Sequence, residues 1–339
     1  MSELVERLED DRPKVRAEAA ADLVELCRTD ADARARFGMR FLTLLNDESP
    51  AVRGQAVLGA VICDEHLAHV DRVLKLLDDP SPGVRLQVIH TLGPLGLPEV
   101  LPALAARLSD EDLLVRTSAA AALSFAGDAS GIPVLLASLE KRNAREEALH
   151  ALRQVASQGD RAAIEKPVRR LFGSLFVSRF ERVAAAGVLA VLGFAEGRAH
   201  LVDRAARKGI DRPLAVELCG ELRVAEAEML LRAAAADAAD PLRGTALRAL
   251  ASLGVADAVG RCSAVLLDER EDADARCDAA EGLLLAATPE AHETLERAAD
   301  AVADARVRGV AAACLALWGK PAREIRLYLP LTGDELPSA

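Results

Sequence analysis

Apolar residues recur along this chain at a helical spacing, and that pattern itself recurs about every thirty residues. Residues 77–96 read LDDPSPGVRLQVIHTLGPLG, and residues 108–127 read LSDEDLLVRTSAAAALSFAG. Counted from the arginine of each phrase, apolar residues fall at offsets −1, +3, +4 and +7, the buried stripe of an amphipathic α-helix. The phrase occurs about ten times, so the sequence predicts a repeat protein. Its arginines are Arg16, Arg53, Arg85, Arg116, Arg145, Arg182, Arg212, Arg243, Arg276 and Arg308.

Start and stop signals bracket the predicted helix. Ser-Pro pairs at 49–50 and 81–82 are typical of a helix N-terminus. A second apolar stripe, such as LPEVLPALAARL at 97–108, precedes the next phrase. Each unit is therefore predicted to be two antiparallel helices that must stack on neighbouring units to cover their apolar faces. Glycines eleven positions after the arginine predict left-handed C-caps at Gly96, Gly127, Gly193, Gly254 and Gly319.

Alanine stands three positions after the arginine in nine of the ten units. Half of the residues are apolar, but only 3% are aromatic. A core of small side chains fills space only when helices approach closely. The alanine position therefore predicts a tight crossing between helices of neighbouring units.

The units resemble HEAT repeats, in particular the short bacterial form known from phycobilisome-lyase-type proteins, over roughly residues 1–320. The resemblance implies an all-α solenoid, a right-handed superhelix of about ten two-helix repeats. Its mark is an Asp six residues before the Arg, and in HEAT proteins these side chains form a ladder between consecutive repeats. An Arg fork is able to bind an Asp and a turn carbonyl together. The pairs are Asp10 and Arg16, Asp47 and Arg53, Asp79 and Arg85, Asp110 and Arg116, and Asp237 and Arg243.

Two regions depart from the repeat pattern. The Asp is missing before Arg145, Arg182 and Arg212, so we expect an irregular centre at about 140–215. It is also missing before Arg276 and Arg308. Residues 321–339 form a separate tail in which Ile325, Leu327, Leu329 and Leu331 alternate with other residues. That period of two predicts an extended segment, which either covers the last repeat or adds a strand to a partner's sheet.

The formal charge of −11 argues against nucleic-acid and anionic-lipid partners. The six cysteines form no CxxC pair and are interpreted as reduced core thiols. The sequence contains no segment typical of a signal peptide or membrane span, so we expect a cytoplasmic protein. We expect no cofactor and no metal.

The window 161–183 carries a local charge of +4 and three of the seven phenylalanines. Phe172, Phe176 and Phe180 are spaced at i, i+4 and i+8. One interpretation is a docking surface for an acidic or phosphorylated partner; the other is a buried stripe with solvated charges around it. The candidate partner-binding residues are Arg169, Arg170, Phe172, Phe176, Arg179 and Arg182.

Other clusters carry weaker signals. Cys63, His66 and His69 have a spacing that suits metal ligands, but no fourth ligand is indicated. His90 and His150 share one offset two repeats apart, too far to act together. The acidic stretch 266–282 lacks the pattern of a calcium loop and predicts a solvated turn.

With no convergent reactive residues, the sequence favours a non-catalytic protein-binding scaffold rather than an enzyme. The alternative is a chromophore-lyase-like or other enzyme-accessory HEAT subunit, since phycobilin lyases usually work as pairs of such subunits. A resemblance to deoxyhypusine hydroxylase fails because only one His-Glu dipeptide, 292–293, is present. A HEAT-like DNA glycosylase ranks last because the charge has the wrong sign.

Overall fold

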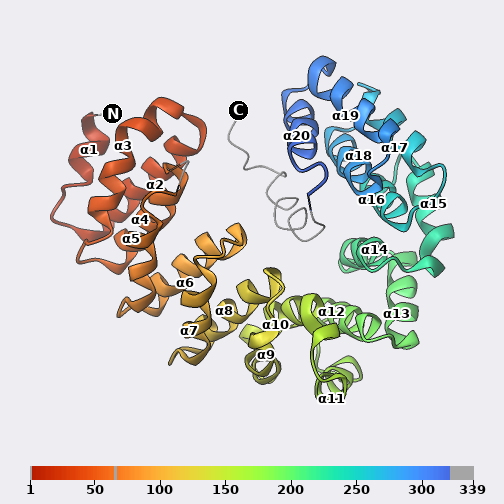
Figure 1. The fold of residues 1–339 in the computed structure, drawn as a ribbon, viewed down its shortest axis with the longest axis horizontal. Coiled ribbons are helices and arrows are strands. Elements are labelled where there is room, and N and C mark those ends of the chain that lie inside the picture. The colour runs from red at the N-terminus through yellow and green to blue at the C-terminus, as the bar shows by residue number, and fades with distance from the viewer. Residues whose placement is uncertain (1, 65–66, 321–339) are drawn as a thin grey trace. The chain divides into compact units, whose positions relative to one another are not determined.

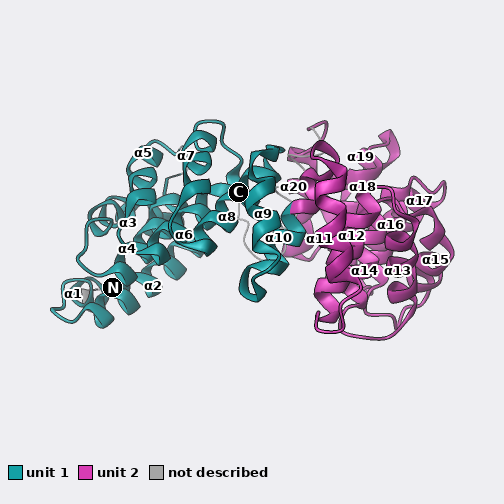
Figure 2. Ribbon diagram, turned by 90° about the horizontal axis from the view of Figure 1, so that it is seen from below, with its two compact units in different colours: residues 1–151, 337–339 teal, residues 152–336 magenta. Residues whose placement is uncertain are grey.

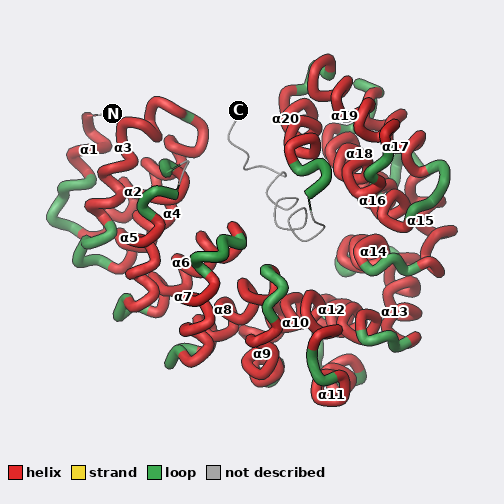
Figure 3. Tube along the Cα trace, in the orientation of Figure 1, coloured by secondary structure: helices red, strands yellow, loops and turns green. Residues whose placement is uncertain are grey.

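The computed structural model describes residues 2–64 and 67–320, and within them it contains twenty α-helices, short 3-10 turns and no strand (Figures 1 and 3). The predicted all-α class and the pairing of helices in successive repeats are confirmed. The tail at 321–339, predicted to be extended, lies outside the described residues. No helix in the described ranges is long and apolar enough to cross a bilayer.

The chain divides into two compact units between Ala151 and Leu152 (Figure 2). The division falls inside the predicted irregular centre. The first unit contains α1 (Ser2–Arg7), α2 (Pro13–Thr29), α3 (Ala31–Leu44), α4 (Pro50–Ile62), α5 (Val70–Leu74), α6 (Pro82–Leu92), α7 (Leu101–Ala106), α8 (Leu113–Phe125), α9 (Ile132–Ser138) and most of α10 (Arg142–Val155). The second unit contains α11 (Arg161–Phe172), α12 (Arg179–Val191), α13 (Ala195–Ala206), α14 (Arg212–Glu221), α15 (Glu228–Ala236), α16 (Arg243–Leu253), α17 (Ala258–Leu267), α18 (Ala273–Ala286), α19 (Pro289–Ala301) and α20 (Ala305–Ala316).

Within each unit the second helices of successive pairs stack on one another. In the first unit α2, α4, α6 and α8 follow in this order, and in the second unit α12, α14, α16, α18 and α20 do so. The first helix of a pair packs beside its second helix, as α13 does on α14 and α19 on α20. Each pair therefore covers the apolar face of its neighbour, as the repeat pattern requires.

The predicted helix boundaries follow from local chemistry. Pro50 and Pro82 occupy the first turns of α4 and α6, where the missing backbone N–H costs nothing. Asp112 caps α8 by accepting hydrogen bonds from the N–H groups of Leu114 and Val115. The five predicted cap glycines all have positive φ, between 59° and 85°. Residues other than glycine rarely adopt this backbone conformation, so the glycines in the sequence set where these turns form.

Small residues form the contacts between second helices. The residue at the predicted crossing position is fully buried in each repeat described in the core, for example Ala56, Ala119 and Ala246. Glycine allows an even closer approach: a Cβ on Gly220 of α14 would lie 2.6 Å from Ala249 Cβ of α16. The alanine-rich, aromatic-poor composition is thus a requirement of the tight stack.

We expect Gly220→Ala to lower the free energy of unfolding by about 1–3 kcal/mol, because the added methyl group overpacks the contact between α14 and α16. Gly260 of α17 is the matched control, since an added Cβ meets nothing within 4 Å. Gly260→Ala is expected to raise stability by up to about 1 kcal/mol through helix propensity. Urea unfolding followed by circular dichroism measures both, and equal effects of the two substitutions would contradict this packing.

Candidate functional site

Arg16, Arg53 and Arg85 of the first unit each link two consecutive turns. Arg53 donates from Nη1 to the carbonyl oxygen of Asp47 in its own turn at 2.8 Å. Its Nε and Nη2 donate to both carboxylate oxygens of Asp79 in the next repeat at 2.7 and 2.8 Å. Arg16 makes the same bonds with Asp10 and Asp47, and Arg85 bonds to the Asp79 carbonyl and the Asp110 carboxylate. These six ladder residues therefore act between repeats. The Asp10 carboxylate instead accepts from Arg12, and Arg116 donates to the carbonyl oxygens of Asp110 and Glu111, so these two predicted residues bond within their own turns.

Each ladder aspartate has a second contact. The Asp79 carboxylate also accepts a hydrogen bond from the N–H of Ser81, just before α6, at 2.8 Å. Burial of Asp79 opposes ionisation, but the bonds from Arg53 and Ser81 outweigh it and lower the pKa of the carboxyl below its usual value. The pKa values of Asp47 and Asp110 are lowered for the equivalent reasons. The carboxylates of the ladder are therefore charged at neutral pH.

The ladder continues in the second unit with acids at different positions. Arg212 makes a two-pronged ion pair with Asp240, at 2.9 and 2.6 Å, and Arg243 pairs with Glu271. Asp237, the residue predicted from the spacing, instead accepts from the N–H of Ala239 in its own turn. The prediction of Asp237 as the ladder residue is therefore wrong. Because this turn is longer, the residue that reaches Arg212 is Asp240, three positions before Arg243 rather than six.

The backbone half of the contact is present in all ten repeats. Where no ladder aspartate precedes the arginine, Arg145 donates to Leu139 O, Arg182 to Ser174 O, and Arg276 to Leu266 O. Arg116 donates to Asp110 O and Arg308 to Val302 O. The bond that each arginine makes to its own turn is therefore kept where the aspartate six positions earlier is missing.

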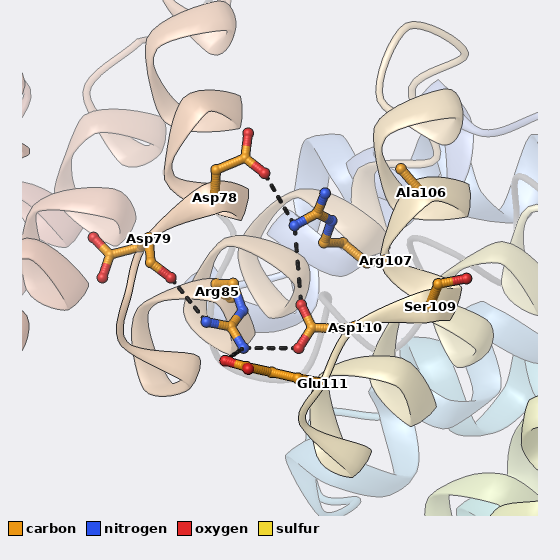
Figure 4. A pocket seen from close by; sticks show the side chains of 8 residues that line it. All are labelled: Asp78, Asp79, Arg85, Ala106, Arg107, Ser109, Asp110 and Glu111. Atoms are coloured by element: carbon orange, nitrogen blue, oxygen red, sulfur yellow. Dashed lines mark hydrogen bonds and ion pairs between the residues drawn. The ribbon is translucent and has the colours of Figure 1, made fainter.

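A shallow hollow of about 320 Å³ lies beside one ladder contact (Figure 4). Arg85 points between the turns that carry Asp79 and Asp110, while Arg107 Nη1 lies 3.0 Å from Asp78 and 3.9 Å from Asp110. Glu111 is 3.6 Å from Arg85. Because the charged groups of this hollow pair with one another, we interpret it as part of the structural ladder.

The α11–α12 loop, residues 173–178, presents the two most exposed large apolar side chains of the described chain. Leu175 is 89% exposed and Phe176 is 97% exposed. The loop around them is held in place: Arg182 donates to Ser174 O at 2.6 Å, and Ser178 forms a capping box with Glu181. We use the name α11–α12 knob for Leu175 and Phe176 together with the exposed Arg170 and Arg179.

The six candidate partner-binding residues divide into two groups. Phe176, Arg170 and Arg179 are exposed in or beside the knob. Arg169, although exposed, stacks over Phe194 at 4.3 Å and pairs with Glu165 and Glu196. Phe172 packs edge-on against His200 at 5.1 Å, and Arg182 supports the loop. These last three residues therefore serve the internal structure.

The expected single helical stripe of Phe172, Phe176 and Phe180 is contradicted. Phe172 ends α11, Phe176 lies in the loop, and Phe180 belongs to α12. The regular spacing of four crosses a helix boundary by coincidence. The signal for that boundary is present in the sequence as Ser178 followed three residues later by Glu181, the pattern of a capping box. Leu175 was not among the candidate residues, since no periodic signal marks it.

The remaining clusters show no convergent chemistry. His90 contacts the Ser118 hydroxyl at 3.2 Å. His66 lies outside the described residues, and among those described no three His, Cys, Asp or Glu side chains are grouped to hold a metal ion. The stretch 266–282 runs from the end of α17 through a turn into α18, where Asp272 caps the helix.

The comparison with protein families decides the nature of the repeats. A model of HEAT repeats matches residues 40–124 and 70–153. These residues are HEAT repeats. The same arginine contacts continue outside the matched range, so the predicted resemblance to HEAT repeats is confirmed.

One curated relative and two solved structures are similar to this chain. Over 85 residues it is 38% identical to the uncharacterized phycocyanin operon protein Z of Pseudanabaena tenuis strain PCC 7409, which covers 25% of this chain and 41% of that protein. The complex of CpcE and CpcF of phycocyanin lyase from Nostoc sp. PCC7120 aligns with a TM-score of 0.47 and 19% identity over 67% of this chain and 92% of that chain. Karyopherin Kap121p, bound to the C-terminus of Cdc14p, aligns with a TM-score of 0.45 and 13% identity over 92% of this chain and 41% of that chain.

These similarities correct one expectation. The sequence favoured a protein that is not an enzyme, but the similarities include phycocyanin lyase and a phycocyanin operon protein. The prediction of a non-catalytic scaffold is therefore wrong in excluding enzyme function. The similar structures are complexes with protein partners, namely CpcE with CpcF and Kap121p with Cdc14p.

We expect Asp79→Asn to lower the free energy of unfolding at pH 7 by about 2–3 kcal/mol, because the Arg53 side chain, only 12% exposed, loses its charged partner. Asp78→Asn is the matched control: the Asp78 side chain is 78% exposed and its pair with Arg107 is expected to contribute less than about 1 kcal/mol. Chemical unfolding of the two variants and the native protein tests this comparison.

The same variants test the pH dependence. The lowered pKa of Asp79 means that its stabilisation is complete above the unfolded pKa of about 3.9 and is lost as the pH falls through the folded value. The difference between the native protein and Asp79→Asn should therefore shrink below about pH 4. A constant difference down to pH 2 would show that the charge of Asp79 does not stabilise the fold.

Proposed function

We propose that this chain is an accessory HEAT-repeat subunit of the chromophore-lyase type, which binds a client protein and assists the attachment of a linear tetrapyrrole to it. The observation that carries the proposal is the 38% identity to a phycocyanin operon protein over 85 residues. Because the match covers 41% of that relative, activity, substrate and partner are all part of the proposal.

The α11–α12 knob supports a role in protein binding. Exposed aromatic and arginine side chains are enriched at the centres of protein interfaces. The fixed loop lowers the entropy cost of binding, since its backbone is already held by Arg182 and by the capping box at Ser178. We therefore propose the knob as the contact with a partner protein.

The cysteines support an accessory role over that of a covalent carrier. All six are free thiols, and five of them are buried. Burial raises the pKa of Cys219 and Cys262 to about 12, and that of Cys277 to about 11. Such thiols are almost entirely protonated at neutral pH and are poor nucleophiles. The acceptor of the chromophore is therefore proposed to be a thiol of the client. Reduced thiols also fit the cytoplasm as the proposed compartment.

The test is an attachment assay with phycocyanobilin and an apo-phycocyanin subunit, with the chain added alone or with CpcF-type lyase subunit. We expect at least a tenfold faster appearance of covalently bound pigment, all of it on the acceptor in a denaturing gel. The variant Leu175→Ser/Phe176→Ser is expected to lose this acceleration while keeping its helical circular dichroism. Met39→Ser, which removes a 67% exposed side chain elsewhere, is the matched control.

Two outcomes would overturn the proposal. If neither mixture attaches pigment faster than the uncatalysed reaction, while the CpcE and CpcF pair does so in parallel, the chain is not of the lyase type. If pigment remains covalently bound to the chain itself, it is a carrier rather than an accessory subunit.

A further inference from the structure

The second helices of successive pairs meet through one recurring contact. Counted from the repeat arginine, positions +1 and +8 of one second helix lie against the next second helix. A Cβ on Gly220, at position +8 in α14, would lie 2.6 Å from Ala249 Cβ of α16. A Cβ on Gly244, at position +1 in α16, would lie 2.7 Å from Ala275 Cα of α18. Each of these helices therefore presents a face that its successor covers.

We use the name stacking face for positions +1, +4 and +8 of a second helix. In α18, which packs on α20, the three residues of the stacking face are buried; they are Cys277, Ala280 and Leu284 (Figure 1). In α20, the last helix of the described residues, the equivalent residues are exposed; they are Gly309, Ala312 and Ala316. A Cβ added to Gly309 would meet no described atom within 4 Å, in contrast to the crowded Gly244. The stacking face of α20 is thus formed like the others but is left open.

The first repeat has a different kind of outer face. Its positions +2 and +6, which lie against the preceding helix in later repeats, are Glu18 and Asp22 of α2, and both are exposed. Asp22 pairs with Arg7 of α1 at 2.8 Å. The end repeats of a solenoid need a polar outer face to stay in solution. The first repeat meets this need, whereas the stacking face of α20 carries only glycine and alanine.

The residues that follow α20 in the sequence suit this open face. Ile325, Leu327, Leu329 and Leu331 alternate with other residues, so an extended segment carries all four on one side. At about 3.3 Å per residue these four side chains span about 20 Å. The twelve residues of α20 span about 18 Å at 1.5 Å per residue. The apolar side of the segment therefore matches the helix in length.

The end of α20 allows the chain to reverse its direction. Gly319 has a φ of 75°, the left-handed conformation that stops a helix. Pro321 follows two residues later and is unable to continue a helix. The segment 325–331 is joined to the stacking face by only a few residues, which gives it an effective concentration on the order of millimolar. A second copy of the chain at micromolar concentration does not compete with a segment tethered in this way.

We propose that residues 325–331 pack in an extended conformation on the stacking face of α20 and run antiparallel to the helix. Glycine and alanine leave room for a backbone to approach closely, and the four apolar side chains cover the helix along its length. The segment thereby takes the place of a further second helix. This contact is independent of the lyase-type function and of the α11–α12 knob, so its test and theirs do not bear on one another.

Photo-cross-linking in the full chain identifies what covers the face. The substitution Ala313→p-benzoylphenylalanine places a photoreactive group beside the stacking face, at a half-buried position. We expect irradiation to give a cross-link within a monomer, which mass spectrometry maps to the peptide that contains residues 325–331. The same substitution at Ala233, an exposed position of α15, is the matched control and is expected not to capture this peptide. Cross-linked dimers would identify a second copy as the occupant and would overturn the inference, as would failure to capture residues 325–331.

Limited trypsin proteolysis of the full chain measures the same contact. Cleavage after Arg326 requires the segment to leave the helix, so its rate follows the population of the open form. Ala312→Glu places a charge on the stacking face and is expected to accelerate this cleavage about tenfold or more. Ala233→Glu is the matched control and is expected to leave the rate unchanged. Because Ala312 is exposed, we expect the helical circular dichroism of both variants to equal that of the native protein.

Substitutions in the segment provide the reciprocal test. Leu329→Ser/Leu331→Ser is expected to accelerate cleavage as Ala312→Glu does, whereas Tyr328→Ser, on the opposite side of an extended segment, is expected to leave it unchanged. Each rate is divided by that of a synthetic peptide with the same tail sequence, which removes effects of the substitution on the protease itself. Equal normalised rates in the native chain, Ala312→Glu and Leu329→Ser/Leu331→Ser would show that the segment does not bind α20.

Discussion

The stack depends on one interaction, the arginine that holds a turn carbonyl of its own repeat and the carboxylate of the next. A guanidinium presents several N–H donors in a fixed plane, so one side chain is able to satisfy both acceptors at once. The carbonyl bond fixes the turn between the two helices of a pair, and the carboxylate bond fixes the next turn relative to it. Lysine, with a single ammonium group, does not offer this geometry.

The carbonyl bond of this contact is kept in more repeats than the bond to a ladder aspartate. All ten arginines keep the carbonyl bond, whereas Arg145 and Arg182 at the centre do so without a ladder aspartate in their own turn. Near them Arg153 passes over Gly187 of α12 to pair with Glu221 of α14. A Cβ at residue 187 would lie 3.2 Å from Arg153 Cδ, so the glycine provides the path. The centre therefore has a longer link across one intervening repeat.

The fold was largely predictable because a residue pattern that recurs in ten repeats is a stronger signal than the same pattern in a single segment. A single alanine says little, but the same position in nine of ten repeats identifies a crossing, and Ala56 and Ala246 are fully buried there. Gly96 and Gly254 have the predicted left-handed backbone. The partners Asp240 and Glu271 were not predictable, because the pairing depends on turn length, and a shift of a few residues in a loop leaves no periodic signal.

At the knob, by contrast, the prediction from apolar periodicity failed. The i, i+4, i+8 spacing of its phenylalanines satisfies the helical rule, yet the capping box at Ser178 starts a new helix between them. Local hydrogen bonding at a helix end therefore outweighed apolar periodicity. Periodicity describes which residues share a face only after the helix boundaries are known.

The exposure of Leu175 and Phe176 gains significance from the rest of the composition. This chain closes its core with alanine and glycine and uses few aromatic residues. Yet Phe176 is left in solvent, on a loop whose backbone is held by Arg182 and Ser178. Ordering this loop lowers the conformational entropy of the chain, and an exposed apolar side chain lowers its solubility, while neither adds a contact that stabilises the fold. We therefore propose that the knob makes a contact outside the chain, and its exposed side chains support a binding role more directly than the repeat architecture does.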